Sequence, residues 1–442
     1  MAEDERISLG PEEAVALWIQ GRDVWNAWVE NNPDADINFQ SVDFNQHRNL
    51  ETINIDYWPF ANFHFPTGKK NFGGTTFGEG DVSFNIATFG DGDVSFDRAT
   101  FGKGNVSFFS ATFGKGEISF LGATFGDGDV SFDRATFGKG HASLFSATFG
   151  KGEVSFNRAK FGDGYVTFNN AAFGDGDVSF YRAKFGLGAF TLDAASLGIG
   201  SYNFGDATFL GRASFANLIN VKTVTSLSFR HASFEKVFTL DSGDTFGCVP
   251  DLVGTKTSHH TSLAGLKCVF PTMLNSSGYR QAKDKGDAER LRRLKELPEQ
   301  NRDFEKTLDF RVEEMRAARW RNKHGFATAL VEGLFWLASD YGRSLVRPLC
   351  GLIGLWLLGA AVYAKASTLP FTYHQLIKAM PFSWGQMFVY IPSSKDARTQ
   401  GLMALFGEHM PNWLYFITFS QSLLTLVLLF QVGLVLRNRF KL

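Results

Sequence analysis

The twelve residues Ala87-Thr-Phe-Gly-Asp-Gly-Asp-Val-Ser-Phe-Asp-Arg98 are followed at once by a near-copy, Ala99-Thr-Phe-Gly-Lys-Gly-Asn-Val-Ser-Phe-Phe-Ser110. The twelve-residue period extends from Phe72 to Phe209 almost without slippage. Self-similarity at a fixed short period is typical of stacked-repeat proteins, in which no single repeat can bury its own apolar face. The repeated segment therefore predicts a solenoid.

Apolar residues recur in pairs inside each copy, as in Val94-Ser-Phe96 and Ala99-Thr-Phe101. Side chains two residues apart lie on the same face of an extended backbone, so each pair is expected to point inward. The next pair begins five residues later, a spacing too short for a helix in every repeat. We predict a solenoid core built from two rows of phenylalanine: Phe77, Phe84, Phe89, Phe96, Phe101, Phe108, Phe113, Phe120, Phe125, Phe132, Phe137, Phe149, Phe156, Phe161, Phe168, Phe173, Phe180 and Phe185.

The five-residue units Val94-Ser-Phe-Asp-Arg98 and Ala99-Thr-Phe-Gly-Lys103 resemble those of pentapeptide-repeat proteins. The resemblance implies a right-handed quadrilateral β-helix with an inward-pointing Leu or Phe at the centre of each side. Here two residues are added after every second unit. The added glycines, such as Gly102 and Gly104, are predicted to form a wider corner with positive φ.

Corner charges favour one coil length over another. Four sides give a coil of about 24 residues, which stacks one column of alternating charge: Glu79, Lys103, Asp127, Lys151 and Asp175. A 36-residue coil would instead stack Asp91, Asp127 and Asp163, like charges about 4.8 Å apart. We therefore predict the shorter coil, although the second corner column is only partly complementary.

The solenoid is predicted to occupy residues 35–275, with its regular array at 72–209. Residues 1–34 precede it as a helical cap, because tryptophans and valines recur at helical spacing over 11–30. An open solenoid edge is a template for aggregation, so a covering helix is expected there. A tryptophan-lined ligand site is the alternative interpretation.

After the solenoid, residues 276–343 are predicted to be a charged helical linker. Ala288, Leu291 and Leu294 recur at helical spacing, and a second helix is expected to begin near Asn301. We interpret the charges as a solvated helix surface rather than a nucleic-acid site.

Residues 344–442 are predicted to be a membrane domain with spans at about 345–368 and 411–436. The 24 residues from Trp413 to Leu436 carry no charge, and such a helix crosses a hydrocarbon core of about 30 Å. Arginine and lysine residues precede the first span and follow the second. We therefore expect a multi-pass cell-membrane protein with both termini and the solenoid in the cytoplasm. Membrane lipid is then an expected partner.

Between the spans, residues 371–391 are apolar but interrupted, which favours a re-entrant or interfacial helix. Span, short helix and span together resemble the two-span potassium-channel-like domains found fused to pentapeptide repeats. No Thr-Val-Gly-Tyr-Gly-type filter occurs, and the segment in its approximate place consists of Met380, Pro381, Phe382, Ser383, Trp384 and Gly385.

Enzymatic chemistry is not expected, because no nucleophile elbow, phosphate loop or catalytic triad is found. Cys248, Cys268, His259 and His260 do not form a recognised metal-ligand spacing, so no metal, cofactor or catalytic residue is predicted. The solenoid array carries 15 acidic and 10 basic residues, a modest excess that gives little support to DNA mimicry. Nucleic acid is not an expected partner.

Two functions remain open. In the first, the protein oligomerises into an ion-conducting pore regulated by the β-helix, for example as a bacterial stress or phage-defence effector. Its pore-lining candidates lie on one stripe of the second span: Thr418, Gln421, Ser422, Thr425 and Gln431. In the second, the protein is a non-conducting membrane-tethered scaffold whose β-helix binds a cytoplasmic protein. Hydrogen bonding across a helix contact is the alternative role of the polar stripe.

Overall fold

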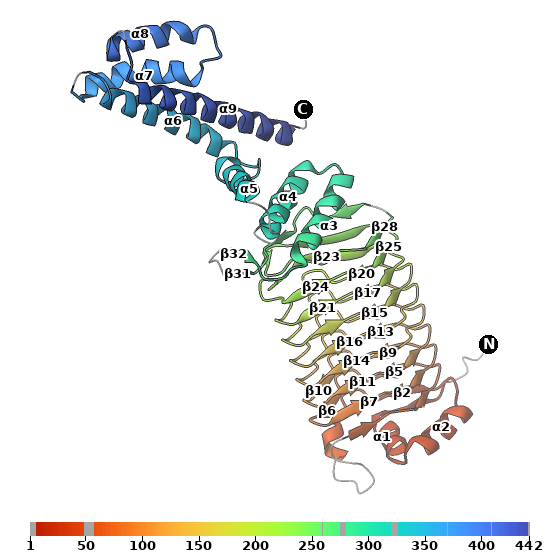
Figure 1. The fold of residues 1–442 in the computed structure, drawn as a ribbon. Coiled ribbons are helices and arrows are strands. Elements are labelled where there is room, and N and C mark those ends of the chain that lie inside the picture. The colour runs from red at the N-terminus through yellow and green to blue at the C-terminus, as the bar shows by residue number, and fades with distance from the viewer. Residues whose placement is uncertain are drawn as a thin grey trace. The chain divides into compact units, whose positions relative to one another are not determined.

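The computed structural model describes residues 6–47, 57–258, 260–274, 280–319, 326–368, 370–407 and 409–440. Contacts divide the chain into two compact units, Met1–Lys306 and Thr307–Leu442. The first unit contains the solenoid, and the second contains the long apolar helices (Figure 1).

Each solenoid coil has four sides, and stacking turns each side into a parallel ladder. We number these faces in the order in which the chain visits them from Val94 onward. The first face is an eleven-stranded sheet: β1 (Ser8–Leu9), β2 (Asp36–Asn38), β5 (Lys70–Asn71), β9 (Val94–Ser95), β13 (Ile118–Ser119), β15 (Ala142–Ser143), β17 (Val166–Thr167), β20 (Phe190–Thr191), β23 (Ala213–Leu218), β26 (Phe238–Ser242) and β29 (Thr261–Ser262). The third face is an eight-stranded sheet: β3 (Tyr57–Pro59), β7 (Asp81–Ser83), β11 (Val106–Ser107), β14 (Val130–Ser131), β16 (Val154–Ser155), β18 (Val178–Ser179), β21 (Ser201–Asn203) and β24 (Ser226–Ser228).

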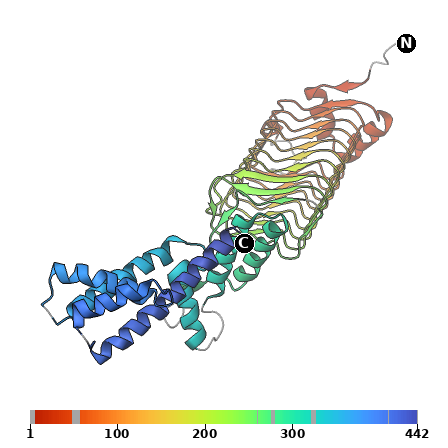
Figure 2. The same cartoon turned by 90° about the horizontal axis from the view of Figure 1, so that it is seen from above.

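The other two faces alternate short strands with single bridges. The second face contains β6 (Thr76–Gly78), β10 (Thr100–Phe101), β27 (Thr245–Phe246) and β30 (Lys267–Cys268), with bridges such as Thr124 to Thr148 between them. The fourth face contains β4 (His64–Phe65), β8 (Thr88–Phe89), β12 (Thr112–Phe113), β19 (Lys184–Phe185), β22 (Thr208–Phe209), β25 (Ser233–Phe234) and β28 (Lys256–Thr257). Figure 2 shows the coils as regular layers.

The register gives the coil length directly. Val94 pairs with Ile118 and Ile118 pairs with Ala142, each 24 residues apart. The predicted β-solenoid with about 24 residues per coil is therefore confirmed. Later coils vary, because Phe190 pairs with Ala213 and Ala213 with Phe238.

Every phenylalanine of the two predicted rows is buried. Rings stack from coil to coil, with centroids 4.8 Å apart for Phe84 and Phe108 and 4.7 Å for Phe108 and Phe132. Rings from the opposite first and third faces meet edge to face, as Phe84 and Phe96 do at 5.5 Å. Both geometries suit the ring quadrupole, so each coil packs well only against its two neighbours.

The corner glycines are required for a different reason from the one predicted. Neither Gly102 nor Gly104 has positive φ. A Cβ on Gly102 would instead lie 1.7 Å from the carbonyl oxygen of Gly78 in the preceding coil. The left-handed residues occupy the other corners, where Arg98 has φ of 55° and Ala99 N–H donates to Phe96 O at 3.0 Å. Positive φ at the third residue is the signature of a type II turn.

The solenoid's N-terminal end is covered by α1 (Pro11–Ile19) and α2 (Arg22–Asn31), with the 3₁₀ turn η1 (Phe44–His47) beside them. The single helix predicted over 11–30 is thus broken, at Gly21 with φ of 92°. Trp18 stacks on Phe60 at 5.4 Å, and the buried Trp25 indole donates to His64 O at 2.7 Å. Both tryptophans extend the aromatic core rather than line a ligand site.

The C-terminal end is covered by α3 (Asp287–Gln300), which follows a hairpin of β31 (Thr272–Leu274) and β32 (Arg280–Ala282). Leu291, Leu294 and Leu297 of this helix are buried. A helical cap at each end protects the ladder edges that would otherwise be open to another chain.

The remaining helices are α4 (Phe304–Ala318), α5 (Phe326–Ser339), α6 (Val346–Lys365), α7 (Tyr373–Met387), α8 (Ser394–Phe406) and α9 (Asn412–Phe440). Helices α6 and α9 are long and apolar enough, by length and composition, to cross a membrane. Within the stretch predicted to be a charged linker, α5 is apolar, and Glu332 is its one charged residue.

Candidate functional site

A buried polar layer lies where α6, α7 and α9 meet. The Gln421 amide donates to Ser383 Oγ at 2.8 Å and its oxygen accepts from the Tyr363 hydroxyl at 2.7 Å. Ser383 Oγ donates onward to Trp356 O at 2.8 Å. Gly359 leaves room for this layer, since a Cβ there would lie 2.5 Å from Gln421 Nε2. The layer fixes the register of three helices at once.

The rest of the predicted stripe is also used inside the chain. Ser422 Oγ donates to Gln386 O at 2.7 Å, and Thr425 donates to Gln421 O at 2.8 Å. Gln431 accepts from Ser339 at 2.9 Å. Gln421, Ser422, Thr425 and Gln431 are buried, and Thr418 is half-buried. Within the protomer, Gln421, Ser422 and Gln431 thus hydrogen-bond to other helices, the alternative role considered for the stripe, and Thr425 bonds within α9.

The segment predicted to be re-entrant is α7, which continues through Pro381. Met380 O accepts from the Trp356 indole at 2.9 Å, and Phe382 meets Tyr363 at 5.0 Å. Because Trp356 is near the middle of α6, α7 lies against the central part of that helix. Ser383 and Gly385 are buried with Phe382, whereas Pro381 and Trp384 are exposed and Met380 is half-buried.

Sequence reasoning missed α8, which forms a hairpin with α7. Its composition hides it, because Lys395, Asp396 and Arg398 interrupt the apolar pattern. The Asp396 carboxylate in the first turn was a usable signal, since acidic residues favour helix N-termini. Figure 1 shows α6 to α9 side by side.

A second candidate site is a strip of cations on the solenoid, which we call the basic strip and define as Arg134, Arg158, Lys160, Arg182 and Lys184. All five side chains are exposed. The arginines occupy the corner between the third and fourth faces in three consecutive coils, and the lysines lie on the adjoining fourth face. The strip thus concentrates five of the array's ten basic residues.

Local charges do not neutralise the basic strip. Arg182 pairs with Asp206 at 3.2 Å, a contact that holds the pKa of Asp206 below its usual value. Within the described part of the chain, no ion pair is found for Arg134, Arg158, Lys160 or Lys184. Lys160 and Lys184 are also bridged neighbours in the ladder, and like charges in that arrangement are destabilising.

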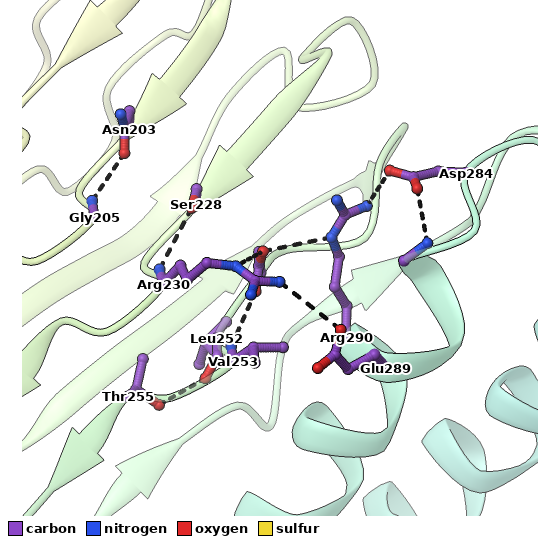
Figure 3. A network of polar contacts seen from close by, with 12 residues as sticks. Asn203, Gly205, Ser228, Arg230, Leu252, Val253, Thr255, Asp284, Glu289 and Arg290 are labelled. Carbon is purple, nitrogen blue, oxygen red and sulfur yellow. Dashed lines mark hydrogen bonds and ion pairs between the residues drawn. The ribbon is translucent and has the colours of Figure 1, made fainter.

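A different polar network attaches α3 to the last coil (Figure 3). The buried Asp251 accepts from Arg230 Nε at 2.9 Å and from the backbone of Val253 at 2.9 Å. Arg290 reaches Asp251 at 3.6 Å and Asp284 at 2.6 Å. Each carboxylate has a cationic partner, so this network is a structural clamp.

The cysteine–histidine interpretation finds no support as a metal site. Among the described residues, no group of three or more His, Cys, Asp or Glu side chains could hold a metal ion. Cys248 is buried, which raises its pKa to about 11, and the thiolate that would bind metal is therefore disfavoured. Cys268 is half-buried and His260 exposed, and His259 lies outside the described residues.

One buried lysine was not expected. Lys70 occupies the inward position that Val94 holds one coil later, and its ammonium donates to Pro66 O, Gly90 O and Gly92 O at 3.3, 3.2 and 2.9 Å. Burial lowers its pKa to about 8, against the attraction of nearby aspartates. Its three N–H donors satisfy carbonyl groups at the corner, so a structural role is sufficient to explain the buried lysine.

Comparison of the chain with protein-family models, with curated proteins and with solved structures finds no match. The function of the protein is therefore inferred from the solenoid surface and the helical unit alone.

Proposed function

We propose that the protein is a membrane-tethered scaffold in which α6 and α9 are the membrane anchor and the solenoid binds an acidic site on a partner protein through the basic strip. The proposal extends the resemblance to pentapeptide-repeat proteins with a membrane domain. It takes both termini and the solenoid to be cytoplasmic, because Arg343 precedes α6, Arg347 lies in its first turn, and Arg437 and Arg439 lie at the end of α9.

The observation that carries the proposal is the charge of four residues of the basic strip, Arg134, Arg158, Lys160 and Lys184, for which no ion pair is found in the described part of the chain. Elsewhere on the regular array, two corner cations have carboxylate partners, Lys103 with Glu79 at 3.5 Å and Lys115 with Asp91 at 2.5 Å. Lys160 and Lys184 are exposed like charges side by side on a rigid ladder, an arrangement that does not stabilise the fold. They gain interaction energy when a partner brings carboxylates to them.

A protein partner fits better than nucleic acid. The basic strip spans three coils, about 10 Å along the axis at the usual strand spacing. The corners beyond it carry Asp163, after Lys160 in the sequence, and Asp206, one coil after Arg182, and these would repel a long polyanion. A compact cluster of carboxylates on another protein can reach the strip without meeting those corners.

Site-specific photocrosslinking in cells tests the proposal. A photoreactive residue replaces Thr136, on the fourth face beside the strip, or Thr124, on the opposite second face. We expect a discrete protein adduct from position 136 only. The double change Lys160→Glu with Lys184→Glu should remove that adduct, because charge reversal at an interface repels the partner.

The matched control, Lys103→Glu with Lys151→Glu, reverses the same number of charges at the corner between the second and third faces. This variant should retain the adduct. Equal adducts at positions 136 and 124, or an adduct that survives charge reversal of the strip, would contradict the proposal.

An ion-conducting oligomer is the second candidate. It is favoured by one observation, the α7–α8 hairpin that packs against the middle of α6 through Trp356 and Met380, because short helices that enter only part of a membrane are typical of channels. Reconstituted protein should then form oligomers and carry current that Ser383→Asp changes. A monomer without current in bilayers would leave the scaffold alone.

A further inference from the structure

An apolar groove of about 860 Å³ lies between α5, α6 and α9 in the second unit. Its walls include Leu334 and Leu337 of α5, Leu358 of α6 and Phe430 of α9, and all four side chains are exposed. Such a volume is within the range of small-molecule sites. The groove could therefore hold an extended hydrocarbon chain.

Gly354 forms part of the groove floor. A Cβ added there would meet nothing within 4 Å, so the space above it is open. Gly351 lies one turn nearer the N-terminus of α6, where the side chain of Leu428 closes the floor. The small residues let α6 approach an occupant closely without crowding.

Two charged residues also line the groove, Arg347 of α6 and Glu332 of α5. The Arg347 guanidinium donates to Trp336 O at 3.1 Å and lies 3.9 Å from Asp340. Asp340 is itself saturated by Arg316 at 2.7 Å and Arg343 at 2.8 Å. Although burial acts to raise it, these contacts hold the pKa of Asp340 below its usual value. Of the three arginines around Asp340, Arg347 is therefore the one most weakly paired with this carboxylate.

We infer that this groove is a binding site for one phospholipid, with an acyl chain along the apolar walls and the phosphate on Arg347. The inference rests on the proposed membrane anchoring of α6 and α9. Basic pockets between membrane helices on the cytoplasmic side commonly bind lipid headgroups. Burial of successive methylene groups supplies the affinity for the chain.

A second copy of the chain fits the groove less well than lipid. An apolar helix in the groove would bury Arg347 and Glu332 in an interface without supplying partners, which is costly. A phospholipid brings its phosphate to the arginine and leaves the headgroup side open to water. Glu332 also sets the headgroup preference, because its carboxylate opposes additional negative charge.

The test uses full-length protein. Carbonate extraction of membranes first establishes whether the protein is integral. Purified protein is then stripped of lipid and titrated with phosphatidylglycerol or phosphatidylcholine, and bound lipid is counted by native mass spectrometry. We expect one tight site per chain. Arg347→Gln should weaken phosphatidylglycerol binding about fivefold, and Glu332→Gln should strengthen it.

Gly354→Phe should abolish the site for both lipids, because the ring fills the groove. Gly433→Phe is the matched control, since Gly433 is also open but does not line the groove. Equal lipid binding by the two phenylalanine variants would overturn the site, and an unchanged Arg347→Gln variant would overturn the phosphate contact. Release of the protein by carbonate would instead refute the anchoring on which the inference rests.

Discussion

Phe108 meets Phe84 on one side and Phe132 on the other, and equivalent contacts recur in every regular coil of the solenoid. In the second unit, Gln421 meets Tyr363 and Ser383 once, and among its described residues no other side chain repeats that contact. The solenoid is thus stabilised by many copies of one interaction, whereas the helices depend on single contacts. A substitution in one coil should therefore destabilise the adjacent coils. A substitution in the polar layer should weaken the packing of a whole helix pair.

The strongest test of this difference removes one ring from the stack. Phe132→Ala should destabilise the solenoid by about 3–5 kcal/mol, from lost burial and the cavity left behind. Hydrogen exchange should show the loss spreading to the coils on either side and fading toward the caps. Thr124→Ala is the control at an exposed ladder position, and equal protection in both variants would contradict the inward packing.

A corner glycine tests the close approach of coils. Gly126→Ala would place a Cβ 2.0 Å from Gly102 O, so the two coils must separate. We expect a cost of about 1–3 kcal/mol and a lower thermal midpoint. Gly243→Ala is the comparison, because a Cβ there meets nothing within 4 Å. Equal midpoints for the two variants would exclude coil contact as the reason for the corner glycines.

In the second unit, Gln421→Leu should cost about 1–2 kcal/mol, since membrane hydrogen bonds average about 0.6 kcal/mol and Gln421 makes several. The loss should appear as faster exchange or proteolysis of the α7–α8 hairpin. Leu423→Ala, at an exposed position two residues further along α9, should leave the hairpin protected. A hairpin unaffected by Gln421→Leu would refute the anchoring role of the polar layer.

The smallest expected effect is a pH dependence. Lys70 has a folded pKa of about 8 and an ordinary value of 10.5, so between these values the unfolded chain binds more protons and stability rises with pH. The rise should reach about 1 kcal/mol per pH unit. The unfolding free energy of the wild type minus that of Lys70→Met should therefore increase from pH 8 to pH 9. A constant value of this difference would contradict the shifted pKa.

The solenoid was predictable because each repeat contains the residues that form the interior. Val94-Ser-Phe96 shows the inward pair, and the 24-residue coil follows from the alternation of Glu79, Lys103 and Asp127. The reason for Gly102 was not predictable, because the obstacle belongs to the neighbouring coil. In the helical unit, the partner of Gln421 lies 38 residues away in Ser383, and no local pattern indicates that pairing. Helix α8 was hidden by its charges.

The ladder register has a further consequence for how such a protein can change during evolution. Val94, Ile118 and Ala142 repeat one contact with a constant interval of 24 residues. An in-frame duplication of one coil can therefore be inserted while the residues at both ends of the solenoid stay the same. Each insertion would lengthen the distance between the N-terminal helices and the basic strip by one strand spacing, about 4.8 Å. The solenoid can thus serve as an adjustable ruler, whose length is set by gene duplication while its surface chemistry stays the same.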